Sequence, residues 1–192
     1  MSTIRMTVAA LAAVAVAAAG CTAQAPQADQ SAGSTIADEH GLAGLDARQM
    51  IERLDATPVA QRSTDLIASV QPDELVLTSG DRTQSVPMPN EEFYLAVAPY
   101  DSRTHECYFH SLTTCLGELR NEQVQVTVTD RATGATVVDD DVTTFDNGFV
   151  GIWLPRGLDC EITVEHDGRR ATAPISTSNP DDLTCLTSLR LA

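Results

Sequence analysis

From residue 91 onward the chain alternates short apolar runs with turn residues, and this pattern constrains the fold more than any other feature. Valines alternate with polar residues between Val124 and Val128, as in a strand with one buried face. The segments Asp146-Asn147-Gly148 and Asp167-Gly168 are hairpin signals, because these residues tolerate the positive φ of tight turns. Strands at roughly ten-residue spacing predict an antiparallel β-sandwich over residues 91–192.

Residues 38–90 have a different pattern, which predicts a small N-terminal domain of one helix and a hairpin. Asp46 and Gln49 resemble a capping box, and the apolar residues that follow have helical spacing until Thr57-Pro58 ends the helix. The expected strands are residues 66–70, 74–78 and 83–88. So small a domain buries little core, so we expect it to dock on the larger domain or to form a dimer. The fold class is therefore α+β overall and mainly β.

The first 20 residues have the pattern of an export signal. A short start with Arg5 precedes an apolar, alanine-rich run that is too short for a confident membrane span. The run ends in Ala-Ala-Gly before Cys21, which resembles a bacterial lipobox, so we expect a signal peptide at residues 1–20 and lipidation of Cys21. An ordinary secretory signal is the alternative. Residues 21–37 are mostly small and polar, and they predict a flexible tether.

The net charge argues against one class of partner, and the positions of the cysteines and aromatic residues indicate which domain carries the functional site. The formal net charge of −15 argues against nucleic-acid binding, which requires a basic surface. All eight aromatic residues lie between Phe93 and Trp153, and the four cysteines other than Cys21 lie beyond residue 106. The C-terminal domain should therefore carry the functional site.

The segment from Thr104 to Cys115 is the most informative in the chain, because it places His110 between Cys107 and Cys115. Thiolates suit Cu(I) or zinc, and imidazole suits zinc and copper. With Cys185 these residues are sufficient for a site of three or four ligands, and His105 is a further candidate. The spacing matches no common zinc finger. Composition alone favours structural disulfides among Cys107, Cys115, Cys160 and Cys185, because an exported protein usually pairs its cysteines.

The sequence also resembles a known family. The segments "HECYFHSLTTCLGEL", "SVQPDELVL", "FYLAVAPY" and "DLTCLTSLRL" are similar to those of the CueP family of periplasmic copper-binding proteins. The order of strands and turns over residues 122–177 also resembles prealbumin-like sandwiches. The CueP resemblance implies that Cys107, Cys115 and Cys185 are the three characteristic cysteines of the family, with His110 as the nitrogen ligand. Cys160 departs from this pattern and could pair with Cys185.

The resemblance implies a copper-binding protein of the cell envelope that acts in copper resistance or as a chaperone. We expect Cu(I) to be held by loop thiolates, and Cu(II) to be reduced stoichiometrically rather than by enzymatic turnover. The partners implied are an envelope superoxide dismutase or a thiol reductase. The lipobox predicts a lipid anchor on the outer face of the cell membrane. A structural zinc site and a disulfide-stabilised binding module without metal remain the alternatives.

Overall fold

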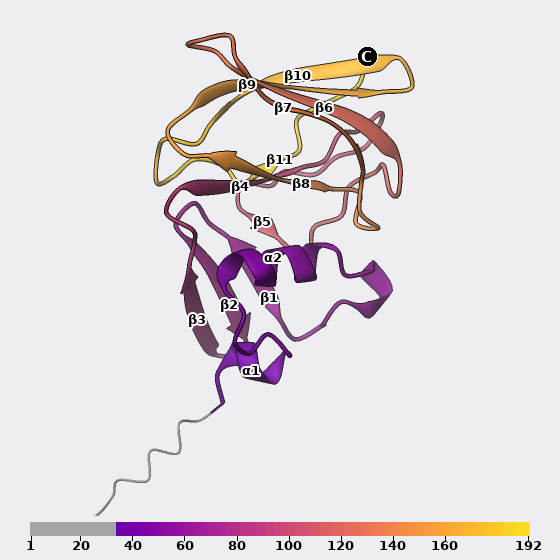
Figure 1. The fold of residues 1–192 in the computed structure, drawn as a ribbon. Helices are drawn as coiled ribbons and strands as arrows, with labels where there is room; N and C mark the ends of the chain where they lie inside the picture. The colour runs from indigo at the N-terminus through magenta and orange to yellow at the C-terminus, as the bar shows by residue number, and fades with distance from the viewer. Residues whose placement is uncertain (1–33) are drawn as a thin grey trace, which may run out of the picture. The chain divides into compact units, whose positions relative to one another are not determined.

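The computed structural model describes residues 34–192 (Figure 1). The expected signal peptide, the lipidation site at Cys21 and most of the tether lie outside the described residues. The first helix, α1 (Ile36–Glu39), begins within the segment expected to be tether, because Thr35 caps it through a capping box and its side chains Ile36 and Ala37 are buried. Residues 35–37, which were expected to belong to the tether, therefore belong to the folded structure. In the described part, no helix is long and apolar enough to cross a membrane.

The N-terminal part follows the sequence pattern closely. Helix α2 (Ala47–Asp55) begins at the capping box formed by Asp46 and Gln49, and a short 3₁₀ helix, Val59–Gln61, follows. Three strands then form consecutive antiparallel pairs: β1 (Ile67–Val70), β2 (Glu74–Ser79) and β3 (Arg82–Pro87). The helix and the hairpin expected from the sequence are thus confirmed.

This small sheet has a fourth strand that comes from the C-terminal half of the chain. Strand β5 (His110–Ser111) pairs with the outer side of β1, where His110 lies opposite Val70 and Ser111 opposite Ser69. The long connection from residue 98 to residue 122 thus returns to the N-terminal sheet before it enters the sandwich. The domain boundary at residues 90 and 91 stays a prediction.

The C-terminal half consists of two sheets. The larger one has the order β10-β9-β6-β7, and the smaller one has the order β11-β4-β8. Their bounds are β4 (Glu92–Val97), β6 (Gln123–Asp130), β7 (Thr136–Thr143), β8 (Val150–Pro155), β9 (Asp159–His166), β10 (Arg169–Ser176) and β11 (Cys185–Leu186). Buried side chains of both sheets form one hydrophobic cluster. The mainly β, α+β fold class is confirmed.

Of the two expected hairpin turns, one is present in the structure and the other is not. Asp167 and Gly168, with φ of 50° and 73°, do join β9 to its partner β10. Asp146-Asn147-Gly148 instead connects β7 to β8, which belong to different sheets, so the expected hairpin at this turn is wrong. Asn147 of this turn is fully buried. The sandwich also departs from the expected antiparallel arrangement in one place. Strand β11 pairs with β4 in parallel, whereas the other strand pairs are antiparallel.

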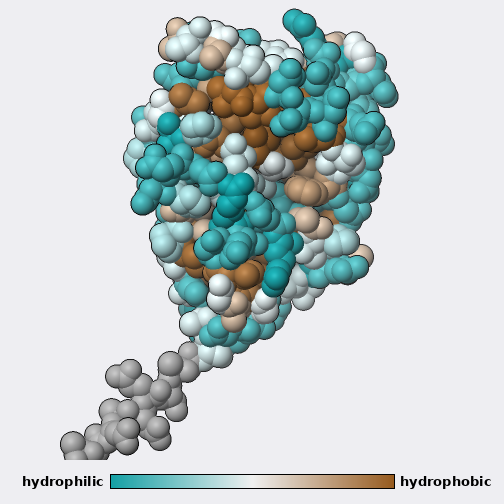
Figure 2. Space-filling view, in the orientation of Figure 1, coloured by the Kyte–Doolittle hydropathy of each residue, from teal (hydrophilic) through white to brown (hydrophobic). Residues whose placement is uncertain are grey.

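A second hydrophobic cluster lies between the small sheet and the sandwich. It combines side chains of α1, α2, β1 and β2 with Tyr94 and Ala96 of β4. Side chains of the connection that carries β5 also belong to it. Cys115 and Cys185 belong to this cluster, and Cys107 packs against it. Figure 2 shows that on the surface an apolar area lies over the sandwich and a smaller one lies below it, separated by hydrophilic side chains. Cys107, Cys115 and Cys185 therefore meet in the cluster between the small sheet and the sandwich.

Candidate metal centre

The connection that carries β5 folds back on itself and brings its two cysteines together. The amide of Cys115 donates to the carbonyl of Ser111 over 3.1 Å, which closes a turn directly after β5. The amide of Ser111 donates to Cys115 Sγ over 3.4 Å. Sγ of Cys107, on the other side of β5, then lies 3.5 Å from Sγ of Cys115. The turn after β5 therefore brings the two thiols together.

The C-terminal segment delivers the third thiol. The amides of Thr184 and Cys185 both donate to the carbonyl of Tyr108, over 3.0 and 3.1 Å. The hydroxyl of Thr184 donates to Val70 O over 2.6 Å and accepts the amide of His110 over 3.0 Å. Thr184 thus links β1, β5 and β11, and it places Cys185 Sγ 3.7 Å from His110 Nδ1.

The sulfur and nitrogen atoms form two overlapping groups that can hold a metal ion. One consists of His110, Cys115 and Cys185, and the other of His105, Cys107 and Cys115, and the ligand atoms in each group lie within 4.8 Å of one another. Two sulfurs bound to one tetrahedral metal ion at about 2.3 Å lie about 3.8 Å apart. The separations of 3.5 Å between Cys107 and Cys115 and 3.7 Å between Cys185 and His110 are close to this value. The side chains therefore fit a soft metal ion.

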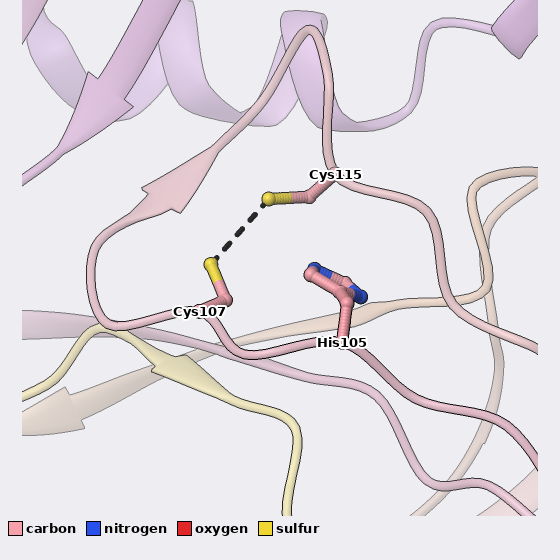
Figure 3. Close-up of side chains that lie close together, drawn as sticks. All are labelled: His105, Cys107 and Cys115. Carbon is pink, nitrogen blue, oxygen red and sulfur yellow. Dashed lines mark hydrogen bonds between the residues drawn. The ribbon is translucent and has the colours of Figure 1, made fainter.

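The two groups differ in burial. His110, Cys115 and Cys185 expose 0%, 9% and 1% of their surface, so the first group, which we call the inner group, lies in the protein interior. His105 and Cys107 are only half-buried, so the second group, the outer group, borders the surface. Figure 3 shows the outer group, in which the sulfurs of Cys107 and Cys115 point toward each other and the ring of His105 lies beside them.

A buried carboxylate supports His110 from the opposite side. Asp55, the last residue of α2, is 1% exposed, and its Oδ1 accepts His110 Nε2 over 3.3 Å and Asn147 Nδ2 over 2.7 Å. Its Oδ2 accepts the hydroxyl of Tyr94, and Arg62 Nη2 lies 3.9 Å from Oδ1. The sequence analysis missed Asp55, Tyr94 and Asn147, because their spacing in the chain shows no relationship to the cysteines.

The buried partners change the pKa of both members of the Asp55–His110 pair. Burial raises the pKa of Asp55, but hydrogen bonds from His110, Tyr94 and Asn147 outweigh burial and lower it. Burial lowers the pKa of His110, but hydrogen bonds to Asp55 and to the thiols of Cys107 and Cys115 raise it well above its usual value. Both shifts favour the charged forms of the pair, an imidazolium at His110 and a carboxylate at Asp55.

Neighbouring groups shift the pKa values of Cys115 and Cys185 in opposite directions. Hydrogen bonds from Cys107 and Cys185, and then from His110, lower the pKa of Cys115 despite burial. Hydrogen bonds to Cys107 and Cys115, together with burial, raise the pKa of Cys185. The surroundings of Cys115 therefore favour its thiolate, and the imidazole of His110 contributes to this effect.

Cys160 lies away from the other three thiols. It is fully buried on β9 in the cluster between the two sheets of the sandwich, opposite Ile175 of β10 and Asp130 of β6. Burial, with the charges of Asp130 and Asp159, raises the pKa of its thiol. All four cysteines of the described part are thiols in this structure.

Comparison with known proteins identifies the family of this chain. The family described as "Periplasmic copper-binding protein CueP" matches residues 49–190. A solved structure entitled "Crystal Structure of S.CueP" is 39% identical in sequence, with a TM-score of 0.76, over 81% of this chain and 94% of that chain. A search of curated proteins gave no match. The family match includes all of the cysteines and histidines of both groups, and this chain belongs to the CueP family of periplasmic copper-binding proteins.

Proposed function

We propose that this exported protein binds Cu(I) as cargo through Cys107, His110, Cys115 and Cys185. The observation that carries this proposal is the convergence of three thiols and one imidazole from two distant segments at ligand separations. Thiolates are the ligands that Cu(I) prefers, and imidazole is a common additional ligand. Copper binding is the established property of the family.

His110 has the geometry of a supported metal ligand. Its Nε2 faces an ionised carboxylate, which can only accept, so Nε2 keeps its proton and Nδ1 is the nitrogen that faces Cys185. Metal-bound histidines usually donate their other ring N–H to such a partner, which orients the ring. When copper binds, His110 must lose the proton on Nδ1, and each thiol that binds must lose its own proton.

The same four side chains suggest a second candidate, a structural zinc site. Three cysteines and one histidine form a tetrahedral set that zinc accepts. Thiolates suit both Cu(I) and zinc, but the family is described as copper-binding. We therefore prefer copper, and competition between the two metals is the deciding measurement.

The pair formed by Cys107 and Cys115 also supports reduction of Cu(II). Oxidation of the two thiols to one disulfide releases two electrons and two protons, and the two electrons reduce two Cu(II) ions to Cu(I). The sulfurs, now 3.5 Å apart, need to approach to about 2.0 Å to form the bond. Each protein molecule performs this reaction once, unless a thiol reductase restores the pair.

The remaining proposals concern location and partners. We propose that Cys21 anchors the protein by a lipid to the outer face of the cell membrane and that an envelope superoxide dismutase receives the copper. A homodimer through the N-terminal part is also proposed. Globomycin sensitivity and lipid labelling test the anchor, and size-exclusion chromatography with light scattering tests the dimer.

An anaerobic Cu(I) titration against a chromophoric Cu(I) chelator tests the proposed function. The reduced protein should bind one Cu(I) ion, and the Cys107→Ser and Cys115→Ser variants should lose affinity by about tenfold or more, since each removes a thiolate. Cys160→Ser is the matched control, because its thiol lies in the sandwich core, and it should bind as the wild type does. Weak binding that is unchanged by Cys107→Ser and Cys115→Ser contradicts the thiolate site, and zinc retained against excess Cu(I) contradicts the preference for copper.

A further inference from the structure

The outer group differs from the inner group in its access to solvent. His105 lies between two surface depressions, one of which is also lined by Cys115 and the other by Cys107. The depressions further include Thr104, Leu116, Glu118 and Thr187. His110 and Cys185, the two ligands that belong to the inner group alone, line neither depression and are at most 1% exposed. An ion from solution therefore meets the outer group before it meets the inner one.

Cys115 belongs to both groups, so they are adjacent and share one ligand. Its Sγ lies 3.5 Å from Cys107 Sγ on the outer side, and both His110 and Cys185 lie within 4.8 Å on the inner side. Phe149 lies between the two imidazoles, with ring centroids 6.2 Å from His105 and 4.5 Å from His110. The two histidines thus contact one aromatic ring and approach the same sulfur.

The ring of His105 lacks the hydrogen bonds that hold His110. Its Nε2 is buried and has no hydrogen-bond partner among residues 34–192, although one ring nitrogen lies within 4.8 Å of both Cys107 Sγ and Cys115 Sγ. A buried polar atom without a partner costs stability. An imidazole without a supporting partner is also a weaker and more easily replaced ligand than one that is oriented by a carboxylate. His105 is therefore suited to temporary binding and His110 to retention.

We propose that His105, Cys107 and Cys115 form a surface exchange station through which Cu(I) enters and leaves the inner group. This inference rests on the proposed function, and it adds the route by which Cu(I) reaches the inner group and leaves it. The ion first binds the outer group, and it then stays on Cys115 while Cys185 and His110 bind it and His105 leaves. Copper remains Cu(I) throughout, so no electron moves. Cys107 and Cys115 release their thiol protons to solvent when the outer group binds the ion, and Cys107 stays bound when His105 leaves. Cys185 then releases its thiol proton as it binds, Nδ1 of His110 gives up any proton that it holds, and release of the ion reverses these steps.

His105→Ala tests the station, because it removes the ligand that the inner group does not need. We expect the equilibrium affinity for Cu(I), measured anaerobically against a chromophoric chelator, to stay within about threefold of wild type. Stopped-flow transfer of Cu(I) from and to the same chelator should become slower by about tenfold or more in both directions. His166→Ala is the matched control, since His166 lies on the far end of β9 and bonds the carbonyl of Gln123, and it should keep wild-type rates.

A second pair of variants isolates the outer group. Cys185→Ser removes an inner ligand, and the remaining outer group should still bind Cu(I) with faster exchange. The double variant His105→Ala with Cys185→Ser should then bind Cu(I) about tenfold or more weakly than Cys185→Ser alone. Equal affinity of these two variants means that His105 is not a ligand and overturns the proposal.

The remaining outcomes are also decisive. Wild-type transfer rates in His105→Ala overturn the exchange station while leaving the thiolate site intact. A loss of equilibrium affinity in His105→Ala that matches the loss in Cys107→Ser makes His105 a permanent ligand, which also overturns the station. If the wild-type protein itself shows no thiol-dependent binding of Cu(I), the proposed function fails, and the station fails with it.

Discussion

Asp55 Oδ1 lies 3.3 Å from His110 Nε2, and 55 positions separate the two residues in the chain. The carboxylate comes from the end of α2 in the N-terminal part, and the imidazole comes from β5 in the connection between β4 and β6. The helix and its sheet thus support the metal centre directly, although the cysteines lie in other segments.

Asp55→Asn should weaken copper binding without unfolding the protein. The amide keeps the size of the side chain but removes the charge that orients and supports His110, and changes of such a partner typically cost about 10–100-fold in metal affinity. X-ray absorption of the Cu(I) complex should show weaker scattering from the nitrogen ligand. Circular dichroism verifies the fold. Asp146→Asn is the control, because Asp146 binds the amide of Val59 and does not contact His110. Wild-type affinity in Asp55→Asn contradicts the role of the carboxylate.

The burial of Cys160 predicts a distinct labelling pattern for the four thiols. In the reduced, folded protein, iodoacetamide should modify Cys107 and Cys115, because Cys107 is half-exposed and the pKa of Cys115 is lowered. Cys160 is fully buried and its pKa is raised, so it should react only after denaturation. Mass spectrometry of the peptides measures both. Labelling of Cys160 as fast as Cys107, or a disulfide between Cys160 and Cys185, contradicts the arrangement seen here.

Gly117→Ala should destabilise the protein close to the metal centre. A Cβ at Gly117 would lie 2.5 Å from the carbonyl oxygen of Gly148, in the turn that carries Asn147. The backbone must move, and such overpacking costs about 1–3 kcal/mol. Denaturant unfolding measures the loss, and we expect a weaker affinity for Cu(I) as well, since Cys115 is two residues away. Gly134→Ala is the control, because its Cβ meets no atom within 4 Å and only its positive φ opposes the change. Equal losses in both variants argue against a close backbone contact.

Glu118 should stabilise the segment before His105 in a pH-dependent way. Its Oε2 accepts the amides of Asp101, Ser102 and Arg103, and the hydroxyl and backbone hydrogen bonds, those of Ser102 first, lower the pKa of Glu118 from 4.5 to about 2. A lowered pKa stabilises the folded state above pH 4.5, and this contribution disappears as the pH falls from there to about 2. Glu118→Gln should therefore differ most from wild type at neutral pH.

Denaturant unfolding at pH 7 and at pH 3, with hydrogen exchange of residues 101–103, measures this effect. The difference in unfolding free energy between wild type and Glu118→Gln should shrink at the lower pH, and exchange of these three amides should be faster in the variant at pH 7. Glu106→Gln is the control on the same connection, because Glu106 is exposed and should change neither quantity. A constant difference at both values of pH argues against an ionised Glu118 as the anchor.

The sequence predicted local elements well, because their causes are local. The capping box at Asp46 and the positive φ available to Asp167 and Gly168 require no knowledge of the rest of the chain. Asp146-Asn147-Gly148 misled for the opposite reason. It has the composition of a hairpin turn, but the side chain of Asn147 is buried, where its Nδ2 donates to Asp55 and its Oδ1 accepts the amide of Phe149.

The candidate site was accessible from the sequence only as a set of ligand types. Cys107, His110 and Cys115 lie within nine residues, so their soft-ligand chemistry is visible, and Cys185 was a candidate by its residue type. The family resemblance then favoured a copper site over structural disulfides. The pairing of β5 with β1 and the links through Thr184 depend on long-range contacts, which no local pattern indicates. For the same reason, the sequence could not separate Cys160 from the other thiols, because strand register places it between the sheets of the sandwich.

The parallel strand β11 also determines when the site becomes complete. Cys185 joins the centre only when β11 has docked beside β4, and it is the last of the ligands to be synthesised and exported. A chain that is still crossing the membrane carries Cys107, His110 and Cys115 but lacks the inner group. If the proposed function holds, such a chain can bind copper only through the outer group, and retention by the inner group begins once the C-terminal segment has docked.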